Sequence, residues 1–235
     1  MISQMFKKLS VIEGVVTRPG LYIGLSETIE PLIGLALPAD HLRLLRLTNG
    51  AEGFGGYIRL FGFGPPSAID LLQWNAENFW KFAWSGRVSP YLCFAETGWG
   101  DQFAYRKDHL AAGDSSVYFI DALAMQPQKI AADFSEFFEN LFLRNCNLPY
   151  DEMTVAAREK IGDLRPGEHV AYNPSPMIGA AELIENIVKL PSRNAMIIAG
   201  DLAVGIDALA PEEVDFHLES YEDDEKRLRI RVVAS

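Results

Sequence analysis

Five large apolar side chains recur at helical spacing after residue 133, and this pattern constrains the fold more than any other. They lie at positions i, i+3, i+4, i+7 and i+8 and are Phe134, Phe137, Phe138, Leu141 and Phe142. Asp133 and Glu136 stand at the two positions of a capping box, which marks where a helix begins. The pattern therefore predicts an amphipathic helix whose aromatic face packs on a core.

Short apolar runs bounded by glycine-rich turns predict the strands that this helix covers. We expect strands at residues 57–61, 91–95, 102–105 and 117–120, and further helices at 27–33, 38–47 and 70–84. Asn49-Gly50 is expected to end the helix before it, because both residues tolerate the left-handed conformation. Together these elements predict an α+β domain over residues 1–149, with a mixed or antiparallel sheet packed against helices.

The composition changes near residue 150, just after Leu148-Pro149, and this change predicts a second unit. Residues 1–150 carry 15 acidic and 12 basic side chains, whereas residues 151–235 carry 17 and 9. We expect residues 150–235 to form a smaller α+β unit that ends in a β-hairpin. Its predicted helices are 152–161 and 180–190, and its predicted strands are 168–172, 195–199, 202–206, 214–219 and 227–232. In the last two strands apolar residues alternate with charges of opposite sign, which favours their pairing.

The charge balance excludes several classes of function. The 235 residues are 49% hydrophobic and carry a formal net charge of -11. Such a surface repels phosphate groups, so we expect binding neither to nucleic acid nor to an anionic membrane. The two cysteines, Cys93 and Cys146, have apolar neighbours and lack metal-site spacing, and no signal-peptide or membrane-span pattern is present. These features predict a cytoplasmic protein.

Motifs for catalysis or cofactor binding are missing from the sequence. The glycines of residues 50–56 are not followed by the Lys-Ser/Thr of a phosphate-binding loop. The four histidines do not pair at metal-ligand spacing, and they are His41, His109, His169 and His217. We therefore predict no catalytic residue, no cofactor and no metal, and a protein that is not an enzyme. A site assembled from distant residues, such as His169 with carboxylates of the second unit, is the enzymatic alternative.

Two groups of residues are candidates for binding a partner. Trp74, Trp80 and Trp84 cannot share one face of a regular helix, so one or two of them are expected to be exposed. Trp99 lies in a Gly-Trp-Gly-Asp turn, where it either anchors a partner or packs as a cover. The acidic run, which is expected to be a solvated turn, offers charge to a basic partner. The candidate residues are Trp74, Trp99, Glu222, Asp223, Asp224 and Glu225.

Three ordered segments resemble the SUKH superfamily, which includes fungal cell-wall-assembly regulators and bacterial immunity proteins. The first is Ile33-Gly34-Leu35-Ala36-Leu37-Pro38-Ala39-Asp40 followed by a leucine-rich helix and Asn49-Gly50. The second is Phe94-Ala95 with Gly100-Asp101-x-Phe103, and the third is Asp133-Phe134-Ser135-Glu136-Phe137-Phe138. The resemblance covers about residues 26–143, and Ala51-Glu52 departs from it where a second glycine is common. Its motif residues, which it marks as structural, are Gly34, Leu37, Pro38, Asp40, Asn49, Gly50, Gly100, Asp101 and Phe137.

The resemblance implies an α+β fold and binding rather than catalysis. It points to an immunity protein or adaptor that neutralises a bacterial toxin of a polymorphic or contact-dependent system. Such toxins are often basic, and an acidic inhibitor gains association rate from charge complementarity. The alternative is a small-ligand or sugar-binding module that uses the aromatic cluster. A homodimer through an open strand edge of the second unit is a further expectation.

Overall fold

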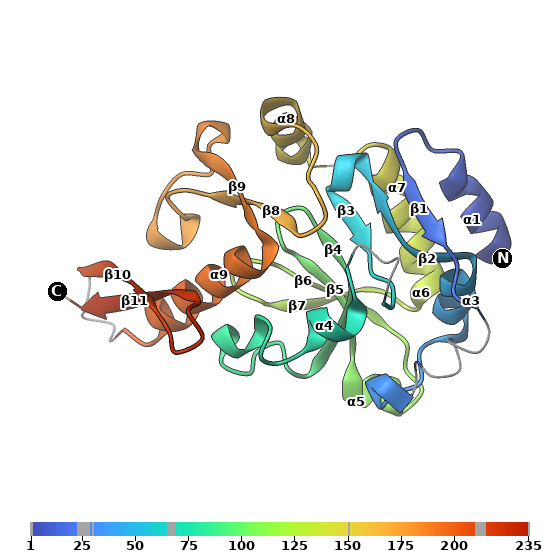
Figure 1. Cartoon of the computed structure of the whole chain (residues 1–235), viewed down its shortest axis with the longest axis horizontal. Helices are drawn as coiled ribbons and strands as arrows, with labels where there is room; N and C mark the ends of the chain where they lie inside the picture. Colours follow the sequence, from blue (N-terminus) through green and yellow to red (C-terminus); the bar gives the residue numbers. More distant parts are fainter. Residues whose placement is uncertain are drawn as a thin grey trace.

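A seven-stranded sheet forms the centre of the molecule (Figure 1). The structure is a computed structural model, and it describes residues 2–22, 29, 31–64, 69–149, 151–209 and 215–234. Each strand pairs antiparallel with its neighbours in sequence. The strands are β1 (Val16–Pro19), β2 (Thr48–Gly53), β3 (Ile58–Leu60), β4 (Tyr91–Thr97), β5 (Gln102–Arg106), β6 (Val117–Ile120) and β7 (Pro127–Ala131). The predicted α+β fold class is confirmed, although β1, β2 and β7 were not predicted.

The predicted aromatic helix covers one face of this sheet. It is continuous through α6 (Phe134–Phe137), the π-helical segment η3 (Phe138–Phe142) and α7 (Leu143–Asn147). Its four phenylalanines are fully buried. Asp133 accepts a hydrogen bond from the Glu136 amide at 2.9 Å, and Glu136 accepts one from the Ala132 amide at 2.7 Å. The helices α1 (Ile2–Ser10) and α3 (Ala39–Leu47) pack beside it at the amino-terminal end of the molecule.

The opposite face is covered by α4 (Leu71–Asn75), η2 (Lys81–Trp84) and α9 (Ser192–Asp207). Neighbouring strand residues point to opposite faces. Phe103 packs on Phe137 of α6, with ring centroids 4.9 Å apart, whereas Gln102 accepts a hydrogen bond from Trp74 of α4 at 2.7 Å. The short helix α5 (Lys107–Ala111) follows β5.

The continuous helix predicted over residues 70–84 is wrong. The backbone is extended at Ala76, where α4 ends, and it turns again before η2 begins. This break allows Trp74, Trp80 and Trp84 to point into one core, with exposed fractions of 2%, 0% and 0%. The expectation that one or two of these side chains are exposed is therefore wrong as well.

The carboxy-terminal segment adds α8 (Glu152–Ile161), α9 and two strand pairs. The pairs are β8 (Glu168–Tyr172) with β9 (Ile187–Pro191), and β10 (Phe216–Glu222) with β11 (Leu228–Ala234). The predicted helix over 180–190 is wrong, because this stretch ends in the single turn η5 (Ile184–Asn186) and β9. The hairpin predicted at 195–206 is also wrong, since both runs lie within α9.

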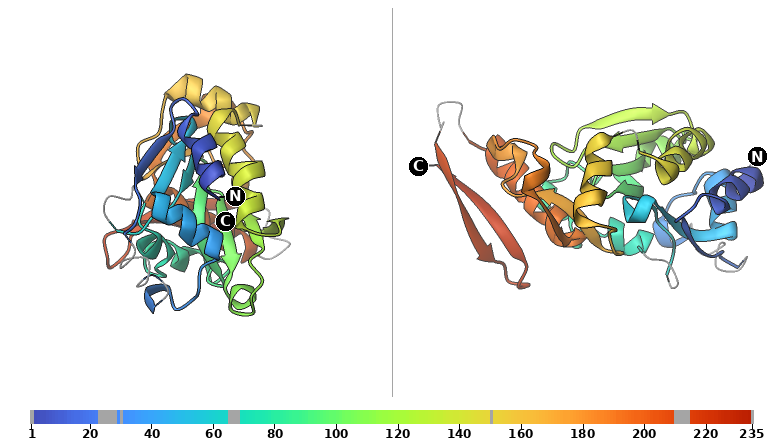
Figure 2. Two further views of the ribbon diagram at one scale, coloured as in Figure 1. Left: turned by 90° about the vertical axis from the view of Figure 1, so that its right-hand side faces the viewer. Right: turned by 90° about the horizontal axis from the view of Figure 1, so that it is seen from above.

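The hairpin of β10 and β11 is confirmed and projects at one end of the molecule (Figure 2). Glu219 lies opposite Arg231, and their charged atoms are 3.8 Å apart, as the alternating charges predict. Among the described residues β10 pairs with β11 alone, so its outer edge is open. The predicted homodimer through this edge stays a prediction. Val214, at the start of the predicted strand, lies outside the described residues. Residues 27, 28 and 30 of the helix predicted at 27–33 also lie outside them, and its other four residues are helical.

Core packing crosses the predicted boundary between residues 149 and 150. Met196, Ile197 and Ala203 of α9 belong to the same hydrophobic cluster as the sheet and the tryptophans. A second cluster joins Tyr57, at the start of β3, to side chains of α8, β8 and β9. The two-domain division stays a prediction. Within the described ranges, no helix combines the length and the apolar character that spanning a membrane requires.

Gly200 packs closely on the first 149 residues. A β-carbon on this glycine would lie 2.9 Å from the backbone carbon and oxygen of Ala83 and from the indole of Trp84. We expect Gly200→Ala to lower the free energy of unfolding by about 1–3 kcal/mol through overpacking. Urea denaturation measures this change, with Glu159→Ala at an exposed position of α8 as the control, whose free energy of unfolding is expected within about 0.5 kcal/mol of wild type. An unchanged midpoint in Gly200→Ala would contradict this close packing.

Candidate functional site

A row of charged and polar side chains crosses one face of the sheet and is buried there. The register places Glu52 opposite Arg59, Arg59 opposite Glu96, and Glu96 opposite Gln102. These four side chains therefore stand side by side on β2, β3, β4 and β5. Arg59 is 1% exposed and Glu96 is fully buried. Burial of charges on this scale requires close partners.

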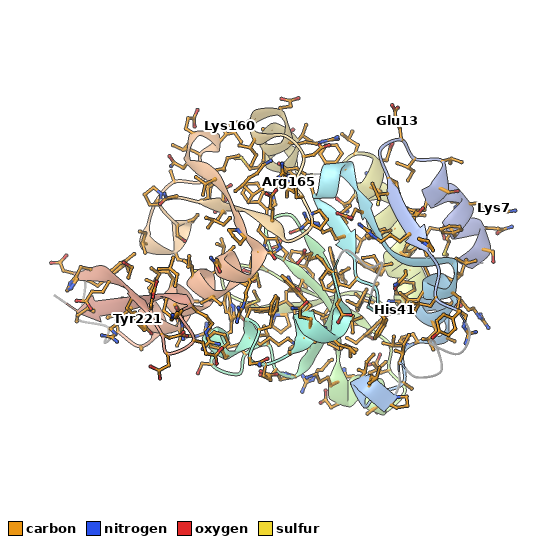
Figure 3. All side chains as sticks on the ribbon, in the orientation of Figure 1. Lys7, Glu13, His41, Lys160, Arg165 and Tyr221 are labelled. Atoms are coloured by element: carbon orange, nitrogen blue, oxygen red, sulfur yellow. The ribbon has the colours of Figure 1, made fainter. Side chains whose placement is uncertain are left out.

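The partners come from both halves of the chain. Arg59 Nη1 lies 3.1 Å from Glu96 Oε1 and also donates to the Glu168 carbonyl at 2.9 Å. Arg59 Nη2 donates to the Arg165 carbonyl at 2.8 Å. Figure 3 labels Arg165 on the loop between α8 and β8, beside β3. Glu52 is paired with Arg18 of β1. The loop at residues 165–168 thus closes over the charged row.

His169 completes this cluster from β8. Its Nε2 atom lies 3.1 Å from Glu96 Oε2, and both side chains are fully buried. Burial alone would raise the pKa of Glu96, but the adjacent His169 and Arg59 together lower it below its ordinary value. The sequence-based alternative paired His169 with carboxylates of the second unit, and this pairing is wrong. The carboxylate beside His169 is Glu96 of the first unit, and both side chains are sealed from solvent.

A hollow of about 800 Å³ opens on the other face of the sheet, between the aromatic helix and α8. We call it the groove. Its floor is formed by apolar side chains of the sheet, among them Ile58, Phe103 and Phe119. Its rim includes exposed polar side chains of β7 and the helix, such as Gln128, Lys129 and Asn140. An apolar floor with a polar rim is the composition of protein-binding surfaces.

Trp99 forms the wall at one end of the groove. It is half-buried, its Nε1 donates to Thr154 Oγ1 at 2.8 Å, and its ring stacks on Tyr172 with centroids 5.1 Å apart. Thr154 Oγ1 in turn donates to Asp151 at 2.7 Å. Burial raises the pKa of Tyr172, and the negative charges of Glu182 and Asp151 raise it further. Trp99 is thus a packed cover that also presents a surface to two hollows.

The other partner candidates differ in their availability. Trp74 is buried in the core and offers no surface to a partner in this structure. Asp223 accepts hydrogen bonds from the Glu225 and Arg227 amides and from Arg227 Nε, at 3.0, 3.0 and 2.6 Å. Burial would raise the pKa of Asp223, but these bonds lower it to about 2. Asp223 therefore holds the turn together, whereas Glu222, Asp224 and Glu225 are exposed.

The residues of the first family-like motif hold local structure. Pro38 precedes the first residue of α3, and Asp40 accepts a hydrogen bond from Ser135 of α6 at 2.6 Å. Asn49 clamps Phe63 by accepting from its amide at 2.7 Å and donating to its carbonyl at 2.9 Å. Gly50 has a φ of +87°, and a β-carbon there would lie 2.8 Å from the Leu60 carbonyl. Asn49-Gly50 lies within β2, which begins at Thr48 directly after the helix ends at Leu47.

The remaining motif residues are also structural. Leu37 and Phe137 are core residues, and Gly34 has a φ of +73°. Asp101 accepts hydrogen bonds from Thr97 Oγ1 at 2.7 Å and from the Ala122 amide at 2.9 Å, and burial raises its pKa. Gly100 has a φ of +91°, and a β-carbon there would meet Met196 and His169 at 2.9 and 3.1 Å. The motif therefore also shapes the contact with the carboxy-terminal segment.

The other histidines are not assembled into a site. His41 is fully buried on α3 and stacks on Phe134, with centroids 4.4 Å apart, and burial lowers its pKa to about 3 (Figure 3). His217 is exposed on β10, and His109 is half-buried. In the part of the chain that the structure describes, no three His, Cys, Asp or Glu side chains are grouped to hold a metal ion.

Comparison with protein families identifies the first part of the chain. Residues 27–140 match the SMI1 / KNR4 family (SUKH-1). The predicted resemblance to the SUKH superfamily over residues 26–143 is confirmed. At the level of the family, the match supports a non-catalytic protein related to immunity or the cell wall. We refer to residues 27–140 as the SUKH-1 segment.

The fold of the whole chain is similar to that of a bacterial protein of known structure. The crystal structure of Atu4351 from Agrobacterium tumefaciens matches with a TM-score of 0.54 and 12% sequence identity, over 100% of this chain and 99% of that one. At this identity the likeness concerns the fold alone. It includes the carboxy-terminal segment that follows the SUKH-1 segment. A comparison with curated proteins gave no match.

The buried cluster predicts how stability depends on pH. Glu96→Gln leaves Arg59 and His169 buried with a neutral partner, which is expected to cost about 3–5 kcal/mol at pH 7. Because the pKa of Glu96 is lower in the folded than in the unfolded chain, its contribution is complete above the ordinary value of 4.5 and decreases as the pH falls further. The difference in free energy of unfolding between wild type and Glu96→Gln, measured by urea denaturation, is therefore expected to become smaller below pH 4.5.

The control for this experiment is Glu159→Gln, a neutralisation of an exposed carboxylate on α8. Its free energy of unfolding is expected to remain within about 0.5 kcal/mol of the wild-type value. If Glu96→Gln changed the free energy of unfolding at pH 7 as little as the control does, the cluster would not stabilise the fold.

Trp99 is expected to dominate quenching of tryptophan fluorescence, because the other three tryptophans are at most 2% exposed. Trp99→Phe should remove most of the collisional quenching by acrylamide, whereas Thr154→Val, which frees the indole N–H, should increase it. Stern–Volmer constants of the folded proteins measure both effects. Equal quenching of wild type and Trp99→Phe would show that another tryptophan reaches solvent.

Proposed function

We propose that this protein binds a bacterial toxin of a polymorphic or contact-dependent system and neutralises it. The observation that carries the proposal is the match of residues 27–140 to the SUKH-1 family, a family of binding rather than catalytic proteins. The groove supplies a surface of suitable composition for a protein partner. Neutralisation then consists of occupying the toxin, which requires no bond to be made or broken in this protein.

The charge of the chain supports a basic partner. The formal net charge is -11, and exposed carboxylates stand at Glu222, Asp224 and Glu225 of the hairpin turn. Such a surface accelerates association with a positively charged protein and suppresses wrong partners. We propose that the protein acts in the cytoplasm, where a toxin that has entered the cell would meet it. The two buried free thiols, Cys93 and Cys146, agree with a reducing compartment.

The alternative function, a sugar- or small-ligand-binding module, depended on an exposed aromatic cluster. Trp74, Trp80 and Trp84 are core residues, so the cluster offers no such surface. Trp99 and Tyr172 line the hollow described in the next subsection, and Phe103 and Phe119 lie on the floor of the groove. We assign these aromatic side chains to the binding of a protein partner.

The proposal is tested in two steps. The protein is captured from its native cell, and a stoichiometric partner is identified by mass spectrometry. That partner is then expressed alone and together with this protein in a growth assay. We expect growth arrest by the partner alone and rescue by co-expression. A partner that does not arrest growth, or arrest that co-expression does not relieve, would overturn the proposed function.

The groove variant Gln128→Arg/Asn140→Arg tests where the partner binds. Two positive charges on its rim should repel a basic partner and weaken binding at least tenfold, or about 1.4 kcal/mol, by isothermal titration calorimetry. Gln4→Arg/Gln73→Arg adds the same charge at exposed positions of α1 and α4 away from the groove, and should bind within about twofold of wild type. Equal weakening by both variants would point to net charge rather than to the groove.

A further inference from the structure

A second hollow lies behind Trp99, between β8, α9 and the start of α8. Its volume is about 270 Å³, below the range of about 300–1,000 Å³ that holds drug-sized ligands. We call it the side-chain pocket. Exposed residues Leu123 and Glu182 stand among its lining, so it opens to solvent. A space of this size suits one long side chain rather than a whole small molecule.

The lining of the side-chain pocket is apolar and negatively charged. Three carboxylates line it, from Asp101, Asp151 and Glu182. None of the described residues that line it is Lys, Arg or His. Asp101 accepts hydrogen bonds from Thr97 and Ala122, and Asp151 accepts them from Met153 and Thr154, whereas Glu182 is exposed at the rim. The described residues that line the pocket therefore supply carboxylates but no basic side chain to neutralise them.

Aromatic and thioether groups supply the rest of the recognition chemistry. The Trp99 ring is fixed by its hydrogen bond to Thr154 and by its stacking on Tyr172, so its orientation is set before a ligand arrives. Aromatic faces attract cations, and guanidinium groups stack on them especially well. Met153, Met177 and Met196 line the pocket with flexible side chains that adapt to an aliphatic stem.

We infer that the side-chain pocket receives an arginine side chain of the protein partner. The guanidinium group would lie against the Trp99–Tyr172 pair within reach of Glu182, and its stem would contact the methionines. This inference rests on the proposed function, because it assigns a specific contact to the same basic partner. It adds an anchor outside the groove, on the far side of Trp99.

The direct test needs no partner protein. The full chain, with its methionine methyl groups labelled for NMR, is titrated with acetyl-GLRLG-amide and, as the matched neutral peptide, acetyl-GLQLG-amide. We expect the arginine peptide to shift the methyl signals of Met153, Met177 and Met196 and to leave those of Met5 and Met125, which lie in the main core, unchanged. Equal shifts with both peptides, or no shifts with either, would overturn the inference.

Two matched variants test whether the carboxylate of Glu182 binds the arginine peptide. Glu182→Gln removes the exposed carboxylate of the pocket rim, and Glu185→Gln removes an exposed carboxylate three residues later that does not line it. An exposed ion pair contributes up to about 1 kcal/mol, so Glu182→Gln should weaken the arginine peptide up to about fivefold. Glu185→Gln should leave its affinity unchanged. Equal effects of the two variants would contradict a specific site, and circular dichroism verifies that both are folded.

The rescue assay separates this inference from the proposed function. If the inference is correct, Trp99→Leu loses both peptide binding and part of the affinity for the partner, while Glu185→Gln loses neither. Rescue that persists at wild-type partner affinity in Trp99→Leu would refute the arginine anchor and leave toxin neutralisation standing. Peptide binding without any toxic partner would instead refute the proposed function and, with it, the assignment of the pocket to that partner.

Discussion

The ion pairing of Arg59 with Glu96 is the interaction on which the arrangement of the two halves depends. Both groups stand in the middle of a sheet, where unpaired charges would cost several kcal/mol each. The sheet provides the pair itself, but Nη1 and Nη2 of Arg59 also donate to the carbonyls of Glu168 and Arg165, and His169 covers Glu96. The carboxy-terminal segment is therefore part of the electrostatic environment of the SUKH-1 segment, even though the family model ends at residue 140.

Local patterns were sufficient for elements whose signals lie within a few residues. The capped helix at Asp133 and the final hairpin are examples, because capping and alternation are properties of the segment itself. The predictions for residues 70–84 and 195–206 failed for tertiary reasons. Extended backbone at Ala76 lets three tryptophans share one core, and Gly200 is tolerated within α9 because it packs on Ala83. Gly200-Asp201 has the sequence of a turn, but Asp201 is held in the helix by its bonds to Arg229.

The site was less accessible to sequence reasoning than the fold. Arg59 stands within the predicted strand at 57–61 and Glu96 directly follows the predicted strand at 91–95, so the available signal was a single charge in or beside an apolar run. The sequence could not show that the two side chains are opposite each other, because that requires the strand register. The hollows were equally hidden, since their walls combine residues from both halves. Trp99 was foreseen either as an anchor or as a cover, and the structure gives it packing on one side and open space beside it.

Trp99, Asp101 and Asp151 line both the groove and the side-chain pocket, so the two hollows are separated by a common partition. A group that enters one of them and displaces the indole changes the shape of the other. Thermodynamic linkage makes such an effect reciprocal, whichever hollow is filled first. The partition is also tied through Thr154 to the first turn of α8 and through Tyr172 to β8. Contacts on either side therefore meet at one indole ring, and two modest contacts of one partner need not contribute independently to its affinity.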